Sequence, residues 1–323
     1  MIGQLEQAIL YRAIHKRADR HYLDLLAESG ERDAEIRLLE AIAATQSQIV
    51  QQQVRDAIAQ GDIKAAEDAI PWDHLKQRNK DALVFLFLAM MHRAAMSART
   101  KMPAGLQDQV TYLPHATFTA MDRRAEAVAN ETTQASREAF RNLARRFTPA
   151  TSDQAAPILT RSIFQTPRDE LAVTNWAARL FQILDGAPLT ANDRAMLRRS
   201  GLAARDIARI GSEGMTSEDL SGIVDGYRAR LLHERVARLV QTWLMQAANE
   251  GAIDQWRQAI AAGHVQAATK TWVVMPDCCE ECEAVAGQTV PLEEDFDTPA
   301  GPLSSPPLHP RCRCSVEMQE TTA

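Results

Sequence analysis

All five cysteines of this 323-residue chain lie within its last 46 residues, where they form two clusters. A Cys-x-x-Cys turn presents two sulfurs to one point, and a second group of nearby ligands completes the tetrahedral nitrogen and sulfur site that zinc prefers. The sequence therefore predicts one structural zinc site, with these candidate ligands: Cys279, Cys282, His309, Cys312 and Cys314.

Three of these residues, Cys279, Cys282 and Cys312, are the ligands that the spacing predicts first. His309 and Cys314 are alternatives for the fourth position, and Cys278 is expected to take no part. Unligated thiols and disulfides are the other interpretations. An odd number of cysteines does not suit disulfides, and the start of the chain predicts no secretory signal, so zinc is favoured.

The segment around these clusters has few residues that can build a core. Its large apolar residues are Val285, Val290, Leu292, Phe296, Leu303, Leu308, Val316 and Met318. A segment this short and this polar usually needs a metal, disulfides or a partner in order to fold. A structural zinc ion contributes about 10–16 kcal/mol in finger-like peptides, which is enough to order such a module.

Charged residues are distributed unevenly along the chain. Residues 277–323 contain ten acidic residues and only two arginines, a net charge of −8, whereas the whole chain carries −6. A zinc module that grips DNA is normally basic. The acidic tail therefore favours protein partners, and at most weak DNA contact is expected.

The remainder of the chain is predicted to be mainly α-helical. Hydrophobic residues make up 46% of the sequence, and glycine and proline are sparse outside the tail. Residues 4–60 have a helical apolar period that predicts a hairpin of two helices with a break at Ser29-Gly30. The apolar run 81–91 would span only about 15 Å as a helix, so we expect a buried core helix and no membrane span.

Proline-containing stretches predict connectors at 101–118 and 148–168, with a long helix over 120–147 between them. We therefore expect four regions. They are an N-terminal helical region (1–102), a connecting helix (119–147), a helical domain (169–263) and a Cys/His-rich module (264–323).

Local signals refine the last two regions. Leu171, Trp176, Leu180, Phe181 and Leu184 predict a buried helical stripe, which Gly186 should end. Thr190 with Asp193, and Thr216 with Asp219, resemble the box that caps a helix N-terminus. Strands are expected at 270–275, 288–292 and 313–318, which would make the tail a small β-containing module.

Arginines gather at the end of the predicted long helix, at positions 137, 141, 145 and 146. They could contact phosphate, but a solvated helix face is the commoner meaning of such a pattern.

The sequence contains none of the common catalytic motifs. His233-Glu234 does not continue as His-Glu-x-x-His, and there is no phosphate-binding glycine loop, nucleophile elbow or deaminase pattern. A catalytic zinc keeps an open coordination position, whereas the tail offers five good ligands. We therefore expect no catalytic residues and no enzyme.

The C-terminal third of the chain, about residues 205–318, resembles the Mu F-like minor head proteins, a family of phage head morphogenesis proteins. Its most specific part is the ending Leu308-His309-Pro310-Arg311-Cys312-Arg313-Cys314; Trp272, the 277–282 knuckle and Ala247-Ala248-Asn249-Glu250-Gly251 are similar too. The chain departs from the family at Thr242-Trp243, where many members have Thr-Glu.

The resemblance implies a structural minor head (minor capsid) protein of a tailed phage, acting in head morphogenesis, and in genome packaging or ejection. It implies the portal protein or the major capsid protein as partners. Its location would be the virion, at the head interior or portal vertex, and the host cytoplasm during assembly. A zinc-dependent hydrolase and a nucleic-acid-binding accessory protein are the alternatives.

Overall fold

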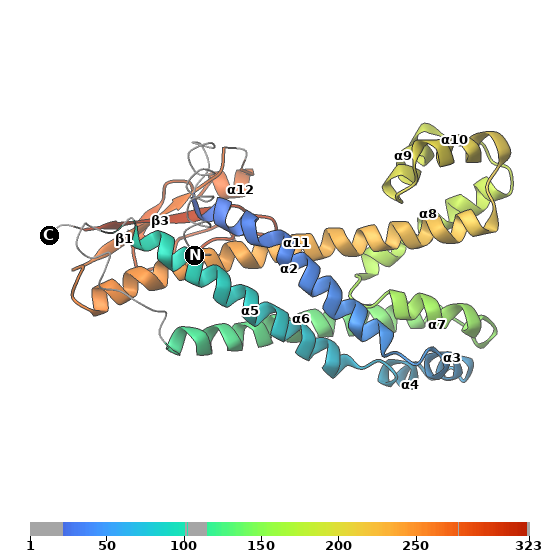
Figure 1. The fold of residues 1–323 in the computed structure, drawn as a ribbon, viewed down its shortest axis with the longest axis horizontal. Helices are drawn as coiled ribbons and strands as arrows, with labels where there is room; N and C mark the ends of the chain where they lie inside the picture. Colours follow the sequence, from blue (N-terminus) through green and yellow to red (C-terminus); the bar gives the residue numbers. More distant parts are fainter. Residues whose placement is uncertain (1–21, 101, 103–114, 277, 322–323) are drawn as a thin grey trace, which may run out of the picture. The chain divides into compact units, whose positions relative to one another are not determined.

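The computed structural model describes residues 22–100, 102, 115–276 and 278–321. These residues are mainly helical and end in a small three-stranded sheet (Figure 1), so the predicted fold class is confirmed. The helices are α2 (Tyr22–Ser47), α3 (Gln51–Ala59), α4 (Ile63–Asp68), α5 (Trp72–Arg99), α6 (His115–Ala144), η1 (Pro149–Thr151), α7 (Ser152–Arg161), α8 (Pro167–Leu184), α9 (Ala191–Arg199), α10 (Ala204–Glu213), α11 (Ser217–Ala261) and α12 (Glu280–Glu283). The strands are β1 (Ala268–Val273), β2 (Thr289–Pro291) and β3 (Ser315–Glu320).

The chain forms two compact units, and the boundaries between them fall within helices. The first unit comprises Met1–Leu38, Lys80–Ala127 and Ala237–Ala323, and the second comprises Leu39–Asn79 and Val128–Val236.

In the first unit, helix α2 passes through Ser29-Gly30 without a break, so the predicted break at this position is wrong. A Cβ atom on Gly30 would lie 3.0 Å from Cε of Met90 and 3.4 Å from Cδ1 of Leu244. The glycine therefore allows close packing against α5 and α11 and does not end a helix. The earlier part of the predicted hairpin, residues 4–21, lies outside the described residues.

The apolar run 81–91 lies in the middle of α5, and Leu83, Phe87 and Met91 are buried as predicted. The burial of this core helix is incomplete, however. Phe85 is 55% exposed, and the guanidinium carbon of Arg37 lies 4.4 Å from its ring centroid.

By length and composition alone, one stretch of the described residues, Ile63–Arg99, could cross a membrane. The core helices of water-soluble proteins pass the same test, so this feature is weak evidence for a span.

Helices α5 and α11 lie very close together at Gly251. A Cβ atom there would lie 2.6 Å from the carbonyl oxygen of Met91 and 2.8 Å from its Cα. Both atoms belong to the backbone, so they cannot move aside as a flexible side chain can. Glycine is therefore required by this helix contact.

We expect Gly251→Ala to destabilise the protein by about 1–3 kcal/mol, because the two backbones must separate to admit the methyl group. Gly222→Ala in the same helix is the matched control, since a Cβ atom there meets nothing within 4 Å. That control should stabilise the protein by up to about 1 kcal/mol through helix propensity. Urea unfolding of both variants checks this, and equal stability of the two would contradict the close contact.

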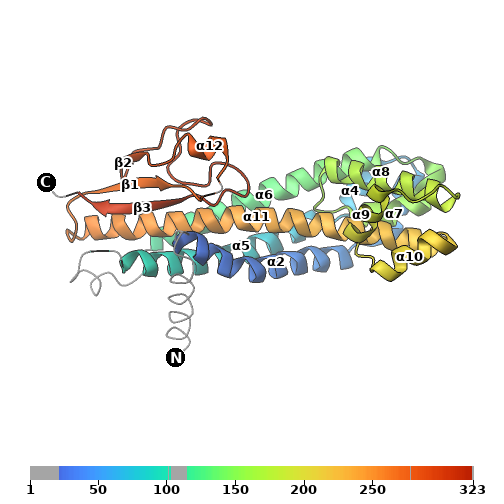
Figure 2. The same ribbon diagram turned by 90° about the horizontal axis from the view of Figure 1, so that it is seen from above.

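The sheet has the order β2-β1-β3, and both pairings are antiparallel. All three predicted strands are confirmed, with Lys270 in register with Val290 on one side and Met318 on the other. Figure 2 shows the sheet lying along the C-terminal part of α11.

Strand β1 alternates buried and half-buried residues, and its buried face carries Lys270 and Trp272. The Trp272 ring meets Phe296 edge to face at a centroid distance of 5.1 Å. Lys270 donates a hydrogen bond to the carbonyl of Ser304 at 2.8 Å, and burial lowers its pKa. These two side chains fasten the loop between β2 and β3 to the sheet.

In the second unit, two predicted capping boxes are confirmed, Thr190 with Asp193 and Thr216 with Asp219. A third box, Thr166 with Asp169, begins α8.

The buried stripe of α8 was only partly predicted. Trp176 and Leu180 are buried, but Leu171 is 48% and Phe181 54% exposed. The buried face continues instead through Val173 and Ile183. Position 173 lies three residues before Trp176, and 183 three residues after Leu180, so both fit the helical period better than Leu171 and Phe181 do.

The expected connector at 148–168 is also wrong in part, because it contains helix α7. Ala155, Ala156 and Leu159 of this helix are buried, and Pro157 lies inside it. The burial of one apolar face outweighs the propensity cost of the proline. Most of the connector expected at 101–118 lies outside the described residues.

Candidate metal centre

The five predicted ligands come from two loops that the sheet brings together. Cys279 and Cys282 lie at the start of α12, in the connection between β1 and β2. His309 and Cys312 lie in the loop before β3, and Cys314 immediately precedes that strand. Strand β1 leads into the first loop and pairs with β3, which follows the second loop. The two loops therefore lie side by side.

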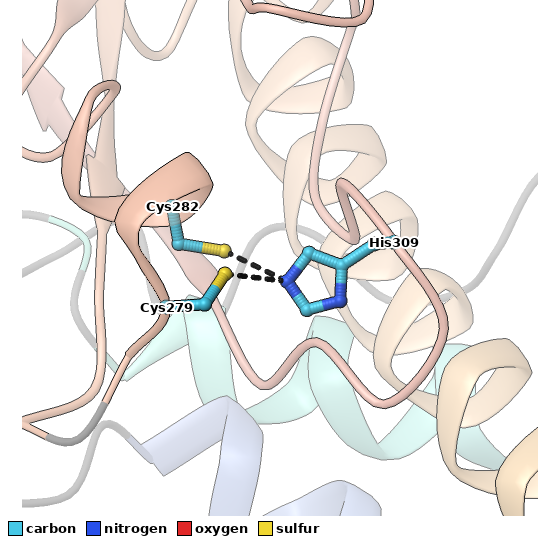
Figure 3. A group of neighbouring side chains, drawn as sticks. All are labelled: Cys279, Cys282 and His309. Carbon is cyan, nitrogen blue, oxygen red and sulfur yellow. Dashed lines mark hydrogen bonds between the residues drawn. The ribbon is translucent and has the colours of Figure 1, made fainter.

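The first group of ligand atoms consists of Cys279, Cys282 and His309 (Figure 3). The Nε2 atom of His309 lies 3.1 Å from Sγ of Cys279 and 3.2 Å from Sγ of Cys282. All three ligand atoms lie within 4.8 Å of one another. The Cys-x-x-Cys turn therefore presents both sulfurs to a single ring nitrogen.

The imidazole of His309 is oriented for coordination by its other nitrogen. Its Nδ1 atom donates a hydrogen bond to the carbonyl of Pro310 at 2.9 Å. A neutral ring that is protonated at Nδ1 has its lone pair on Nε2, the atom that faces the sulfurs. This is the tautomer that a metal ligand requires.

The second group consists of Cys282, Cys312 and Cys314, all of them buried. The Sγ atoms of Cys282 and Cys312 are 3.7 Å apart. Cys282 belongs to both groups and thus joins them. The arrangement brings together all five predicted ligands, and Cys278 is in neither group.

These distances suit a tetrahedral metal ion. Two Zn–S bonds of about 2.3 Å at the tetrahedral angle place the sulfurs roughly 3.8 Å apart. The observed separation of 3.7 Å between Cys282 and Cys312 agrees with this value. The cluster can therefore bind a metal ion, and its sulfur-rich donor set is of the kind that zinc prefers.

None of the five cysteines is in a disulfide. The sulfur separation of 3.7 Å is also much longer than the roughly 2.05 Å of a disulfide bond. The disulfide interpretation of the two clusters is therefore not supported.

The thiols of the cluster differ in acidity because they share hydrogen bonds. Hydrogen bonding from Cys314 lowers the pKa of Cys312 to about 5 and raises the pKa of Cys314 itself. Burial raises the pKa of Cys282 to about 12. Backbone hydrogen bonding at Cys282 lowers the pKa of Cys279. A cation would replace the protons that these sulfurs otherwise share, since thiolates are the ligand form.

Helix α11 holds the ligand loop through its backbone at Arg311. The Thr242 hydroxyl accepts a hydrogen bond from the Arg311 N–H at 3.1 Å, and Gln241 donates to the Arg311 carbonyl at 3.4 Å. Arg311 has a φ of 65°, which is unfavourable for a residue with a side chain. These contacts hold the turn that separates His309 from Cys312.

Asn249 of the same helix makes the second attachment. Its fully buried amide nitrogen donates to the Met245 carbonyl at 2.9 Å and to the carbonyls of Pro306 and Cys314, both at 3.3 Å. Its Oδ1 atom accepts from the Val316 N–H at 2.9 Å. Asn249 thus fixes the chain on both sides of Cys312.

We expect Asn249→Ala to destabilise the first unit by about 2–4 kcal/mol, because it leaves buried backbone groups of Cys314 and Val316 unpaired. Asn249→Asp is the matched control. It keeps the acceptor for the Val316 N–H but loses the donor for the two carbonyls. Urea unfolding measures the stability of each variant. Transfer of zinc from the zinc-loaded protein to a chromogenic chelator measures metal retention. An alanine variant with wild-type stability and metal retention would contradict this role.

Sequence reasoning singled out the cysteines and the histidine that cluster here, but not the residues that position them. Gln241 and Thr242 are polar residues within α11, and no local sequence signal predicts that they contact the loop. Asn249 could have been noticed, because an amide among Ala247, Ala248 and Gly251 is unusual on an apolar helix face.

A scan against protein-family models and searches of curated proteins and of solved structures found no match to this chain.

Proposed function

We propose that this chain is a structural minor head protein of a tailed phage, and that a zinc ion stabilises its C-terminal module. Cys279, Cys282, Cys312 and His309 are the proposed ligands, and Cys314 is a hydrogen-bonding neighbour of Cys312. The ion has a structural role, because four protein ligands leave no open position for catalysis.

One observation carries this proposal. The residues that resemble the Mu F-like family are those that meet around the cluster: the knuckle with Cys279 and Cys282, and the ending with His309 and Cys312. Asn249, which belongs to the similar stretch of α11, holds the same ending. The similarity therefore falls on a set of residues that form one structural unit.

The proposed partners are the portal protein or the major capsid protein, and the proposed location is the portal vertex or head interior. The helices would supply the contact surface. The protein would act in assembly of the head and would catalyse no reaction.

Gradient sedimentation of lysate from cells that produce the phage particles tests the assignment. The chain should co-sediment with heads and with the portal, at few copies per particle, when detected by quantitative mass spectrometry. A cytosolic host protein of similar mass serves as the control for trapping. A chain that always sediments alone would overturn the proposal.

A further inference from the structure

The second unit contains an open groove of about 460 Å³ that the metal centre does not explain. It is lined by Ile63, Lys64, Glu67, Arg137, Arg141 and Arg145. The first three residues come from α4, and the arginines come from the end of α6 and the turn that follows it. Four of the six lining residues are cations.

A buried carboxylate holds two of the arginines in place. Oε1 of Glu67 lies 2.9 Å from Nε of Arg137, and Oε2 lies 2.9 Å from Nε of Arg141. The Glu67 side chain is almost fully buried, whereas both arginine side chains remain about one-third exposed. One carboxylate thus orients two guanidinium groups and leaves the groove with an excess of positive charge.

The arginines form a line along the groove. Positions 137, 141 and 145 follow one another at intervals of four residues, and the Arg145 N–H still donates to the Arg141 carbonyl at 3.1 Å. A helix rises about 1.5 Å per residue, so the row is about 12 Å long, with roughly 6 Å between neighbours. Lys64, on α4, adds a fourth cation, and its side chain pairs with Asp68 on its own helix.

Interaction with the helix dipole does not account for all of these cations. Cations near a helix C-terminus interact favourably with its dipole, but this effect is limited to the last turn. It explains Arg145 and Arg141, whereas Arg137 lies two turns before the end of α6 and Lys64 belongs to another helix.

We propose that this groove binds the phosphodiester backbone of a nucleic acid without regard to base sequence. Guanidinium groups bind phosphate oxygens with two parallel hydrogen bonds, and a row of them suits a ligand with regularly repeated phosphates. A single phosphate ion would occupy only one part of such a row. Among the described residues that line the groove, Ile63 alone is uncharged, so none of them is an aromatic or amide group that could read a base.

Fluorescence anisotropy with a labelled duplex DNA of random sequence, about 20 base pairs long, tests this proposal on the full chain. The variant Lys64→Gln/Arg145→Gln removes two groove cations and keeps both arginines that pair with Glu67. The control Arg198→Gln/Arg205→Gln removes the same charge from exposed positions on α9 and α10. Circular dichroism establishes that both variants are folded.

The wild type should bind the duplex with an affinity that falls steeply as salt increases. The groove variant should bind roughly tenfold or more weakly at 0.1 M salt, and the slope of log K against log salt should decrease by about 1.8, since each contacted phosphate contributes about 0.9. The control variant should retain the wild-type affinity and slope.

Three results would overturn the proposal. They are no duplex binding by the wild type at about 50 mM salt, equal losses in the groove and control variants, or full competition by millimolar inorganic phosphate at constant ionic strength. The last result would show a site for free phosphate. The inference does not rest on the proposed role in a phage head, since the binding assay uses the purified chain alone.

Discussion

Replacing Cys282 by serine should remove the bound metal and unfold the C-terminal module while the helices of the second unit remain folded. Cys282 is the residue shared by both ligand groups, with His309 at 3.2 Å and Cys312 at 3.7 Å. Its loss therefore disrupts the whole cluster. Because structural zinc contributes about 10–16 kcal/mol in small zinc-dependent folds, no other single substitution in this chain should have a larger effect.

Cys278→Ser is the matched control, because Cys278 is the neighbouring cysteine that belongs to neither ligand group. Limited proteolysis with mass spectrometry should show rapid cleavage between residues 278 and 314 in the Cys282 variant only. Far-ultraviolet circular dichroism should show that most helix remains. Equal protection of the C-terminal region in the two variants would contradict a structural role for the metal.

Replacing Trp272 by alanine should cost about 3–5 kcal/mol, which is the usual range for deleting a buried tryptophan. Its side chain is fully buried on the inner face of β1, against the ring of Phe296. Removing it leaves a cavity beneath the loop between β2 and β3, which carries His309, Cys312 and Cys314. We therefore expect metal affinity to fall together with stability.

Trp272→Phe is the matched control for this substitution. The Trp272 Nε1 atom is buried and has no hydrogen-bond partner among the described residues, so phenylalanine loses volume but no hydrogen bond. Its cost should be about 1–2 kcal/mol. Urea unfolding of the zinc-loaded proteins measures both values, and an alanine variant no less stable than the phenylalanine variant would contradict this core.

The parts of the fold that could be predicted depend on short-range signals. Cys279 and Cys282 are three residues apart, and a turn of that length brings their sulfurs together in almost any fold. The capping boxes at Thr190 and Thr216 are equally local, since they involve one turn of helix. The strands followed from their composition.

The parts that could not be predicted depend on contacts between distant residues. Gly30 is indistinguishable from a helix breaker in sequence, and only its proximity to Met90 and Leu244 explains it. The proline at 157 indicated a connector, but burial of the opposite face of α7 outweighs its cost.

The groove shows the same limit. Its arginines were visible in the sequence as a basic helix end, which usually indicates a solvated face. Glu67 lies about 70 residues away in sequence and yet pairs with two of these arginines, so they are held in a groove and do not form a simple solvated face. No local pattern could associate these residues.

X-ray absorption spectroscopy at the zinc edge, combined with metal analysis of the purified chain, tests the central claim most directly. We predict one zinc ion per chain, bound by three sulfurs at about 2.3 Å and one nitrogen at about 2.0–2.1 Å. A preparation that contains no metal and yet resists protease in its C-terminal region as well as the zinc-loaded protein would contradict the account.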